Sequence, residues 1–168
     1  MLPDKQLGDT PELHLAWLDF YRDTVDRKLA GLSEAGLRNS RLPSGWSPLE
    51  LLKHLVFMER RWLRWGYTAE PVDRPWGDSG GADDAPWQLE AGDTLAGLLE
   101  QLRAGGERTR EIVSGAELTS KAAVGGRFGS EDEAPTLNWI LFHVLQEYAR
   151  HAGQLDIARE LADGVTGE

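Results

Sequence analysis

Helical periodicity is the feature that most constrains this chain. Apolar residues recur every three or four positions in several long segments, and no segment alternates in the manner of a β-strand. The clearest helix start is "SPLE", where Ser47 caps the helix, Pro48 takes the first position and Glu50 completes a capping box. The chain of 168 residues is long enough for one domain with a hydrophobic core. We therefore predict a single all-α domain, a four-helix bundle with helices at about residues 10–31, 47–66, 93–113 and 136–162.

The connection between the second and third helices restricts the topology further. Residues 67–92 are rich in proline, glycine and aspartate, a composition typical of a loop. Antiparallel neighbours need only a few linking residues. About 26 residues can run the whole length of a bundle, at about 3.3 Å per extended residue. We therefore predict a long crossover, with the second and third helices parallel and the second and fourth helices antiparallel.

Composition excludes several classes of function. The net charge of −10 argues against a nucleic-acid partner, because such binding depends on lysine and arginine at the phosphates. We interpret the basic residues Arg60, Arg61 and Arg64 as a solvated helix face. The chain has no cysteine, which excludes disulfides, thiolate metal ligands and a cysteine nucleophile. No apolar run reaches the roughly 20 residues of a membrane span, and none at the N-terminus marks a signal peptide, so we expect a cytoplasmic protein.

The stretch "HVLQEYARH" carries His143, Glu147 and His151, each four residues from the next. On a helical wheel, Glu147 and His151 fall inside or at the edge of the apolar face, whereas His143 lies closer to the rim. A carboxylate and an imidazole that point into a bundle need partners, which could be each other, a basic side chain or a metal ion. His143 and His151 lie about 12 Å apart along the axis, so a single ion cannot bind all three residues.

His54 is the candidate for the third ligand, because it flanks the apolar face of the second helix. With the second and fourth helices antiparallel, His54 lies about 10 Å from one end of the bundle, His151 about 16 Å and Glu147 about 22 Å. His143 lies about 28 Å from that end, and a parallel arrangement would instead bring it level with His54. His54, Glu147 and His151 would then form a three-ligand metal site with open positions, and His143 would lie behind the ligands or on the substrate side. An ordinary ion pair between Glu147 and His151 is the alternative.

Other residues have less specific interpretations. His14 follows the first turn of the first helix, and we interpret it as a surface or cap-proximal residue. Met58, Trp62 and Tyr148 are candidates for lining a pocket, although core packing is the simpler interpretation for the two aromatic residues. Most of the seven tryptophans should pack in the core, while an aromatic pocket for an organic ligand is the alternative. Zinc and nickel suit histidine and carboxylate ligands, and iron and manganese also fit.

The stretches "SPLELLKHLVFMERRW" and "LNWILFHVLQEYARHAGQLDIARELADGVTG", with the long loop between them, resemble the DinB-like superfamily of metal-binding four-helix bundles. The resemblance covers about residues 10–165, and the sequence looks closest to an actinobacterial branch of the superfamily. The superfamily typically holds its metal with one histidine of the second helix and two residues four apart on the fourth. These positions are His54, Glu147 and His151 in this chain. Many members have histidine in place of Glu147, whereas the related mycothiol-dependent maleylpyruvate isomerase pattern is histidine, glutamate and histidine, as here.

The resemblance implies a metal-dependent thiol S-transferase. In that chemistry a divalent metal, zinc or nickel, activates a low-molecular-weight thiol such as mycothiol or bacillithiol, which attacks a small electrophile. The isomerase has an additional C-terminal domain that this sequence does not carry, so isomerase activity is not implied. The alternatives are a hydrolase that uses metal-bound water and a non-catalytic binding or stress-response protein stapled by its metal. We expect a small-molecule substrate and no nucleic-acid or membrane partner, and we leave a homodimer open.

Overall fold

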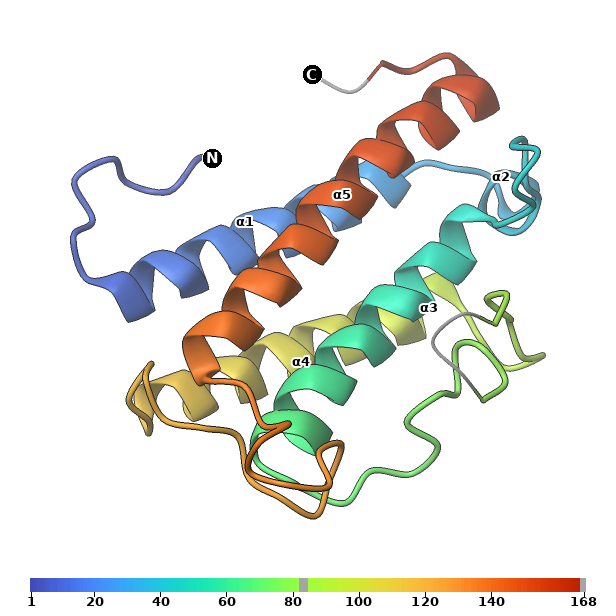
Figure 1. The fold of residues 1–168 in the computed structure, drawn as a ribbon. Coiled ribbons are helices and arrows are strands. Elements are labelled where there is room, and N and C mark those ends of the chain that lie inside the picture. The colour runs from blue at the N-terminus through green and yellow to red at the C-terminus, as the bar shows by residue number, and fades with distance from the viewer. Residues whose placement is uncertain (82–84, 167–168) are drawn as a thin grey trace.

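The computed structural model describes residues 1–81 and 85–166, and in this part of the chain it contains helices and no named β-strand. The fold class predicted from the sequence, all-α, is confirmed. Lys121 and Thr136 form an isolated β-bridge in the loop that precedes the last helix. The helical elements, in chain order, are α1 (Thr10–Leu29), α2 (Glu34–Arg38), α3 (Pro48–Glu59), η1 (Arg60–Tyr67), α4 (Leu95–Ser114) and α5 (Leu137–Asp163) (Figure 1).

The helix starts follow from the capping residues. The predicted capping box of α3 is present, because Ser47 Oγ accepts from Glu50 N at 3.3 Å and Glu50 Oε2 accepts from Ser47 N at 2.7 Å. Asp9 caps α1, because its Oδ1 accepts from Glu12 N at 2.9 Å, and α5 ends at Gly164, which has a φ of 78°. The short helix α2 was not predicted from the sequence. Residues 47–66, predicted as one regular helix, form α3 and most of η1.

Contacts between side chains show that α3 and α5 are antiparallel. In the middle of α3, the ring of His54 lies 4.9 Å from that of His151, in the second half of α5. Further along, Trp62 in η1 lies 5.5 Å from Trp139, at the start of α5. Residues later in α3 and η1 therefore contact residues earlier in α5, as in an antiparallel pair.

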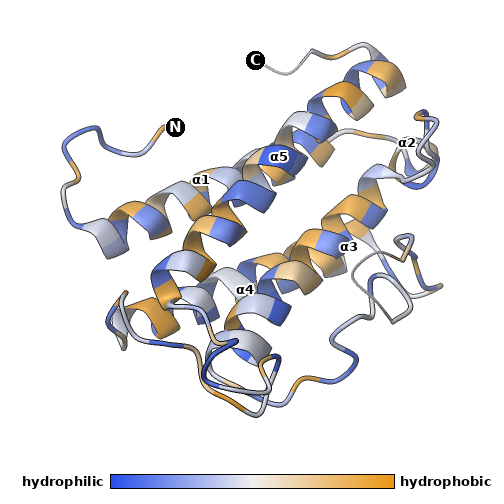
Figure 2. Cartoon of the chain, viewed as in Figure 1, coloured by the Kyte–Doolittle hydropathy of each residue, from blue (hydrophilic) through white to orange (hydrophobic). Residues whose placement is uncertain are grey.

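The helices α3 and α4 are parallel, as the long crossover predicted. Lys53, in the middle of α3, pairs at 2.8 Å with Asp93, which lies just before α4 begins. Arg64, in η1, and Arg108, in the second half of α4, both pair with Glu70. Figure 1 shows the green connection after η1 returning along the bundle to the start of α4. The long helices are amphipathic, and Figure 2 shows hydrophobic and hydrophilic residues alternating along them. None of the described helices is both long and apolar enough to span a bilayer.

The helix that begins with α3 widens into the π-helical segment η1, which the 3.6-residue periodicity did not reveal. The loop of residues 115–136 docks on its end, where Ala123 N donates to Tyr67 O at 2.8 Å and Arg127 N donates to Trp65 O at 3.2 Å. Gly126 permits this approach, because a Cβ atom at this residue would lie 2.1 Å from Trp65 O. The loop is therefore held against η1 by backbone contacts.

The interpretation of His14 as a surface or cap-proximal residue was wrong. Its side chain is 5% exposed, and its Nε2 lies 3.0 Å from Asn138 Oδ1 at the start of α5. The ring also meets Phe142 edge-on, with 4.8 Å between centroids. Burial lowers the pKa of His14, although the hydrogen bond to Asn138 acts in the opposite direction. The start of α5 covers this residue, a contact that the first helix alone could not indicate.

A buried polar cluster joins the four long helices. Glu59 of α3 accepts from Tyr148 Oη of α5 at 2.6 Å and from Arg22 Nε of α1 at 3.2 Å, both at Oε2. Its other oxygen accepts from Arg22 Nη2 and from the hydroxyl of Thr109 in α4. All four side chains are buried, and Gly106 leaves room for the guanidinium, since a Cβ there would lie 3.0 Å from Arg22 Nε. Removing any member leaves a buried group without its partner.

We predict that Arg22→Met lowers the free energy of unfolding by about 3–5 kcal/mol, because Glu59 would keep its buried charge without the opposing cation. Tyr148→Phe removes one of several donors to the carboxylate and should cost about 1.5–3 kcal/mol. Arg103→Met is the control, because Arg103 is exposed and pairs at the surface with Asp26, where an ion pair contributes about 0–1 kcal/mol. Urea denaturation measures all three. An Arg22→Met cost equal to that of the control would contradict the importance of the cluster.

Candidate metal centre

The structure brings together the three residues that the sequence predicted as metal ligands. Glu147 Oε2 lies 3.2 Å from His151 Nε2 and 3.8 Å from His54 Nε2. One donor atom from each residue lies within 4.8 Å of the others. Glu147 and His151 are one turn apart on α5, and the antiparallel packing of α3 brings His54 to the same height. This arrangement could hold a metal ion.

Hydrogen bonds on the far side of each ring indicate which nitrogen faces the cluster. His54 Nδ1 lies 3.2 Å from Asp78 Oδ2, and His151 Nδ1 lies 2.7 Å from Gln154 Oε1. Both partners offer oxygen acceptors, so each ring can donate from Nδ1, which would leave the lone pair of Nε2 for an ion. Without an ion, His151 Nε2 hydrogen-bonds Glu147 Oε2 at 3.2 Å. Within the described residues, His54 Nε2 is the buried side-chain atom that lacks a hydrogen-bond partner. Two imidazole nitrogens and a carboxylate oxygen, one nitrogen being unsatisfied, fit a divalent transition metal.

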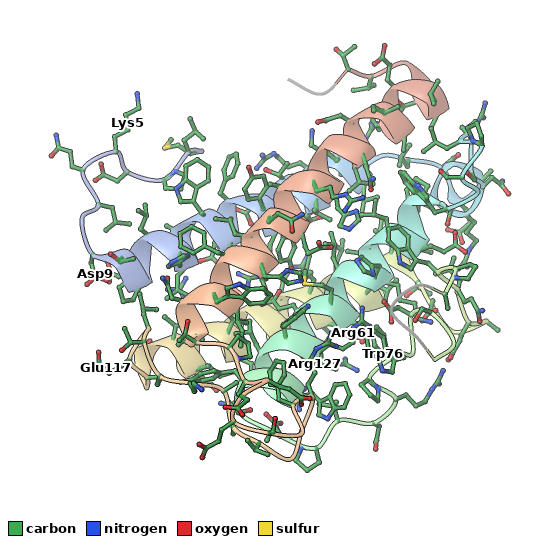
Figure 3. All side chains as sticks on the ribbon, viewed as in Figure 1. Lys5, Asp9, Arg61, Trp76, Glu117 and Arg127 are labelled. Carbon is green, nitrogen blue, oxygen red and sulfur yellow. The ribbon has the colours of Figure 1, made fainter. Side chains whose placement is uncertain are left out.

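The partner of His54 is a residue that sequence reasoning missed. Asp78 lies in the crossover loop and forms a buried ion pair with Arg61, with Oδ1–Nη1 at 2.5 Å and Oδ2–Nη2 at 3.1 Å. The interpretation of Arg61 as part of a solvated face was wrong, because this side chain is 3% exposed. Arg61 also stacks on Trp76 at 4.3 Å. Figure 3 shows Arg61, Trp76 and Arg127 close together beside the lower part of α3.

Tryptophan side chains pack on the cluster and on His143, the histidine one turn away from it. Trp87, from the crossover loop, stacks on His54 with 4.4 Å between centroids and 20° between planes. His143 lies 4.3 Å from Trp62 and stacks nearly parallel on Trp139 at 5.3 Å. His143 is one helical turn before Glu147 and is not part of the three-residue cluster. His143, which the helical wheel placed near the rim of the apolar face, therefore lies among aromatic rings.

The three predicted pocket-lining residues differ in exposure. Met58 and Tyr148 are 2% and 0% exposed and pack in the core, with Tyr148 bonded to Glu59. Trp62 is half-buried and lies between Arg127, 4.3 Å from its ring, and His143. Of the three, Trp62 alone is not fully buried, and it lies next to His143.

The electrostatics of the cluster favour a charged carboxylate. The hydrogen bond from His151 and the attraction of His54 hold the pKa of Glu147 far below its usual value, against the effect of burial. Burial lowers the pKa of His54, but contacts with Asp78 and Glu147 raise it by more, so the net pKa lies above the ordinary 6.5. The two carboxylates therefore favour the protonated form of His54 when no ion is bound.

The crossover between parallel helices and the His–Glu–His cluster define a DinB-like helical bundle. A family model described as mycothiol-S-transferase matches residues 13–164. Because this match covers most of the 168 residues, the chain belongs to the mycothiol-S-transferase family. No curated protein and no solved structure matched the chain.

We predict that metal binding releases a proton from His54. The raised pKa stabilises the folded, metal-free protein below pH 6.5, and this contribution disappears as the pH rises through the pKa of the folded state. An ion needs the free lone pair, so roughly one proton should leave per metal bound near pH 6.5, with the number falling at higher pH. Calorimetric titration in buffers of different ionisation enthalpy measures this number. Equal proton release at pH 6.5 and at higher pH would contradict the assignment of the released proton to His54.

Proposed function

We propose that this protein is a metal-dependent S-transferase, in which a low-molecular-weight thiol of the mycothiol type attacks a small electrophile. Membership of the mycothiol-S-transferase family supports the reaction class. The observation that carries the metal requirement is the buried, unsatisfied Nε2 of His54, which lies 3.8 Å from the carboxylate of Glu147. A cluster built only as an ion-pair network would be expected to satisfy that nitrogen.

The proposed ligands are His54, Glu147 and His151, which are three protein donors. Catalytic zinc sites have the same number and keep a further position open for water or substrate. A divalent metal, zinc or nickel, would supply the positive charge that favours the thiolate form of a bound thiol. The three residues orient their donors toward one point, and Glu147 is ionised at neutral pH because of its low pKa. None of the 168 residues is a cysteine, so the sulfur nucleophile must come with the cosubstrate.

The aromatic residues next to the ligands have the proposed role of enclosing the reactants. Trp87 covers one face of the His54 ring, which limits the access of water to that ligand. We place His143 and Trp62 on the substrate side. His143 lies one turn before Glu147 along α5, and Trp62 contacts it from η1. We expect the reaction to take place in the cytoplasm, where low-molecular-weight thiols stay reduced.

We predict that the purified protein contains about one metal ion per chain and that His54→Ala and His151→Ala lose it, because each removes one of three ligands. His143→Ala should keep the metal, since His143 lies outside the cluster. Elemental analysis without added metal makes this comparison. His14→Gln is the control, a histidine substitution at a bonded site away from the cluster. Full metal content in His54→Ala would rule out the proposed ligand set.

We predict that turnover of an electrophilic reporter requires both mycothiol and the metal. The ligand variants should lose about 100-fold or more in rate, because charge stabilisation by a metal is worth several kcal/mol. Turnover without thiol would instead indicate a hydrolase that uses metal-bound water. A third outcome is full metal occupancy without turnover, whether or not thiol is present, together with lower stability of His54→Ala. That outcome would indicate a metal that only stabilises the bundle.

A further inference from the structure

The loop that connects η1 to α4 surrounds His54 although it supplies none of the proposed ligands. Asp78 contacts the edge of the imidazole through Oδ2, 3.2 Å from Nδ1, and its side chain is fully buried. Trp87 covers the face of the same ring at 4.4 Å. The ring is therefore held both at its edge and on its face by one loop.

The main chain of Asp78 links these two contacts. Its carbonyl oxygen accepts from Gln88 N at 2.7 Å, and Gln88 directly follows Trp87. One residue thus bonds the ring of His54 through its side chain and fixes, through its backbone, the segment that stacks on that ring. A residue with only a packing role would not need both connections.

A further set of contacts holds Asp78 in place. Arg61 bonds both carboxylate oxygens of Asp78 and also donates to Pro75 O at 3.0 Å. Gly77 lets the loop approach α3 closely, because a Cβ atom there would lie 2.7 Å from the ring of Phe57. The carboxylate therefore has one position and accepts hydrogen bonds from two sides.

We propose that Asp78 is a positioning residue of the metal centre, which holds His54 as the Nδ1–H tautomer so that Nε2 faces Glu147 and His151. An ionised carboxylate only accepts hydrogen bonds, so the proton must lie on Nδ1 when the imidazole is neutral. Carboxylate partners of ligating histidines orient the ring and raise its affinity for metal. This inference rests on the proposed metal site, and it adds the crossover loop to that site.

The competing explanation is that Asp78 serves only as the counter-charge of Arg61. Two double variants separate the explanations, because both remove the ion pair and so leave no unpaired buried charge. Arg61→Met with Asp78→Asn keeps a hydrogen-bond acceptor at residue 78. Arg61→Met with Asp78→Leu has nearly the same shape and no acceptor. Asp73→Leu is the control, an equivalent change at an exposed residue of the same loop.

Two measurements on these proteins test the proposal. Nitrogen-15 NMR of the metal-free protein at about pH 8.5, where imidazole is normally neutral, reports which nitrogen of His54 carries the proton. Competition with a chelator measures the affinity for zinc. We expect His54 in the wild type to be protonated on Nδ1, and Asp78→Leu in the double variant to lose that preference. Its zinc affinity should fall about 10- to 100-fold below that of the Asn double variant, while Asp73→Leu stays within about twofold of the wild type.

The outcomes distinguish this proposal from the proposed function. Equal zinc affinity in the two double variants, or an Nε2-protonated His54 in the wild type, would overturn the positioning role of Asp78. A wild type that binds no zinc, nickel or manganese would overturn the proposed function. The tautomer of His54 would still decide in that protein whether Asp78 orients the ring.

Discussion

The carboxylate of Glu59 is the centre on which the arrangement of the helices depends. It accepts hydrogen bonds from α1, α4 and α5 through Arg22, Thr109 and Tyr148, in a region where an unpaired charge would be very unfavourable. The apolar faces of four helices can slide or rotate against one another at modest cost. A buried carboxylate with three donor residues has one satisfied arrangement, so it fixes the helices relative to one another.

The hydrogen bond between Glu59 and Tyr148 also sets the height of the proposed metal ligands. Glu59 and Tyr148 meet across the antiparallel pair α3 and α5. His54 lies five residues before Glu59, about 7.5 Å along its helix, and His151 lies three residues after Tyr148, about 4.5 Å in the same direction. Because Glu59 and Tyr148 lie at the same height, His54 and His151 come close together. Glu147 directly precedes Tyr148 and lies beside them. A change in that register would separate the donors.

Helices and a loop contribute different parts of the site. The helices α3 and α5 provide the proposed ligands, whereas the crossover loop provides the carboxylate and indole that hold His54. The proposed ligands therefore lie on rigid elements, and the residues around them lie on a connection that can vary. One carboxylate and two neutral imidazoles would leave a divalent ion with net positive charge, which favours an anionic sulfur.

Sequence patterns were enough to predict the four long helices, the capping box at Ser47, the crossover and the cluster of His54 with Glu147 and His151. These features depend on local capping and on spacing along a helix, which has a fixed rise and rotation per residue. Tertiary structure alone decided the burial of His14 and Arg61, the widening into η1 and the placement of Asp78 and Trp87 around His54. Each of these depends on which distant segment covers a residue, and a loop has no periodicity from which that contact could be calculated.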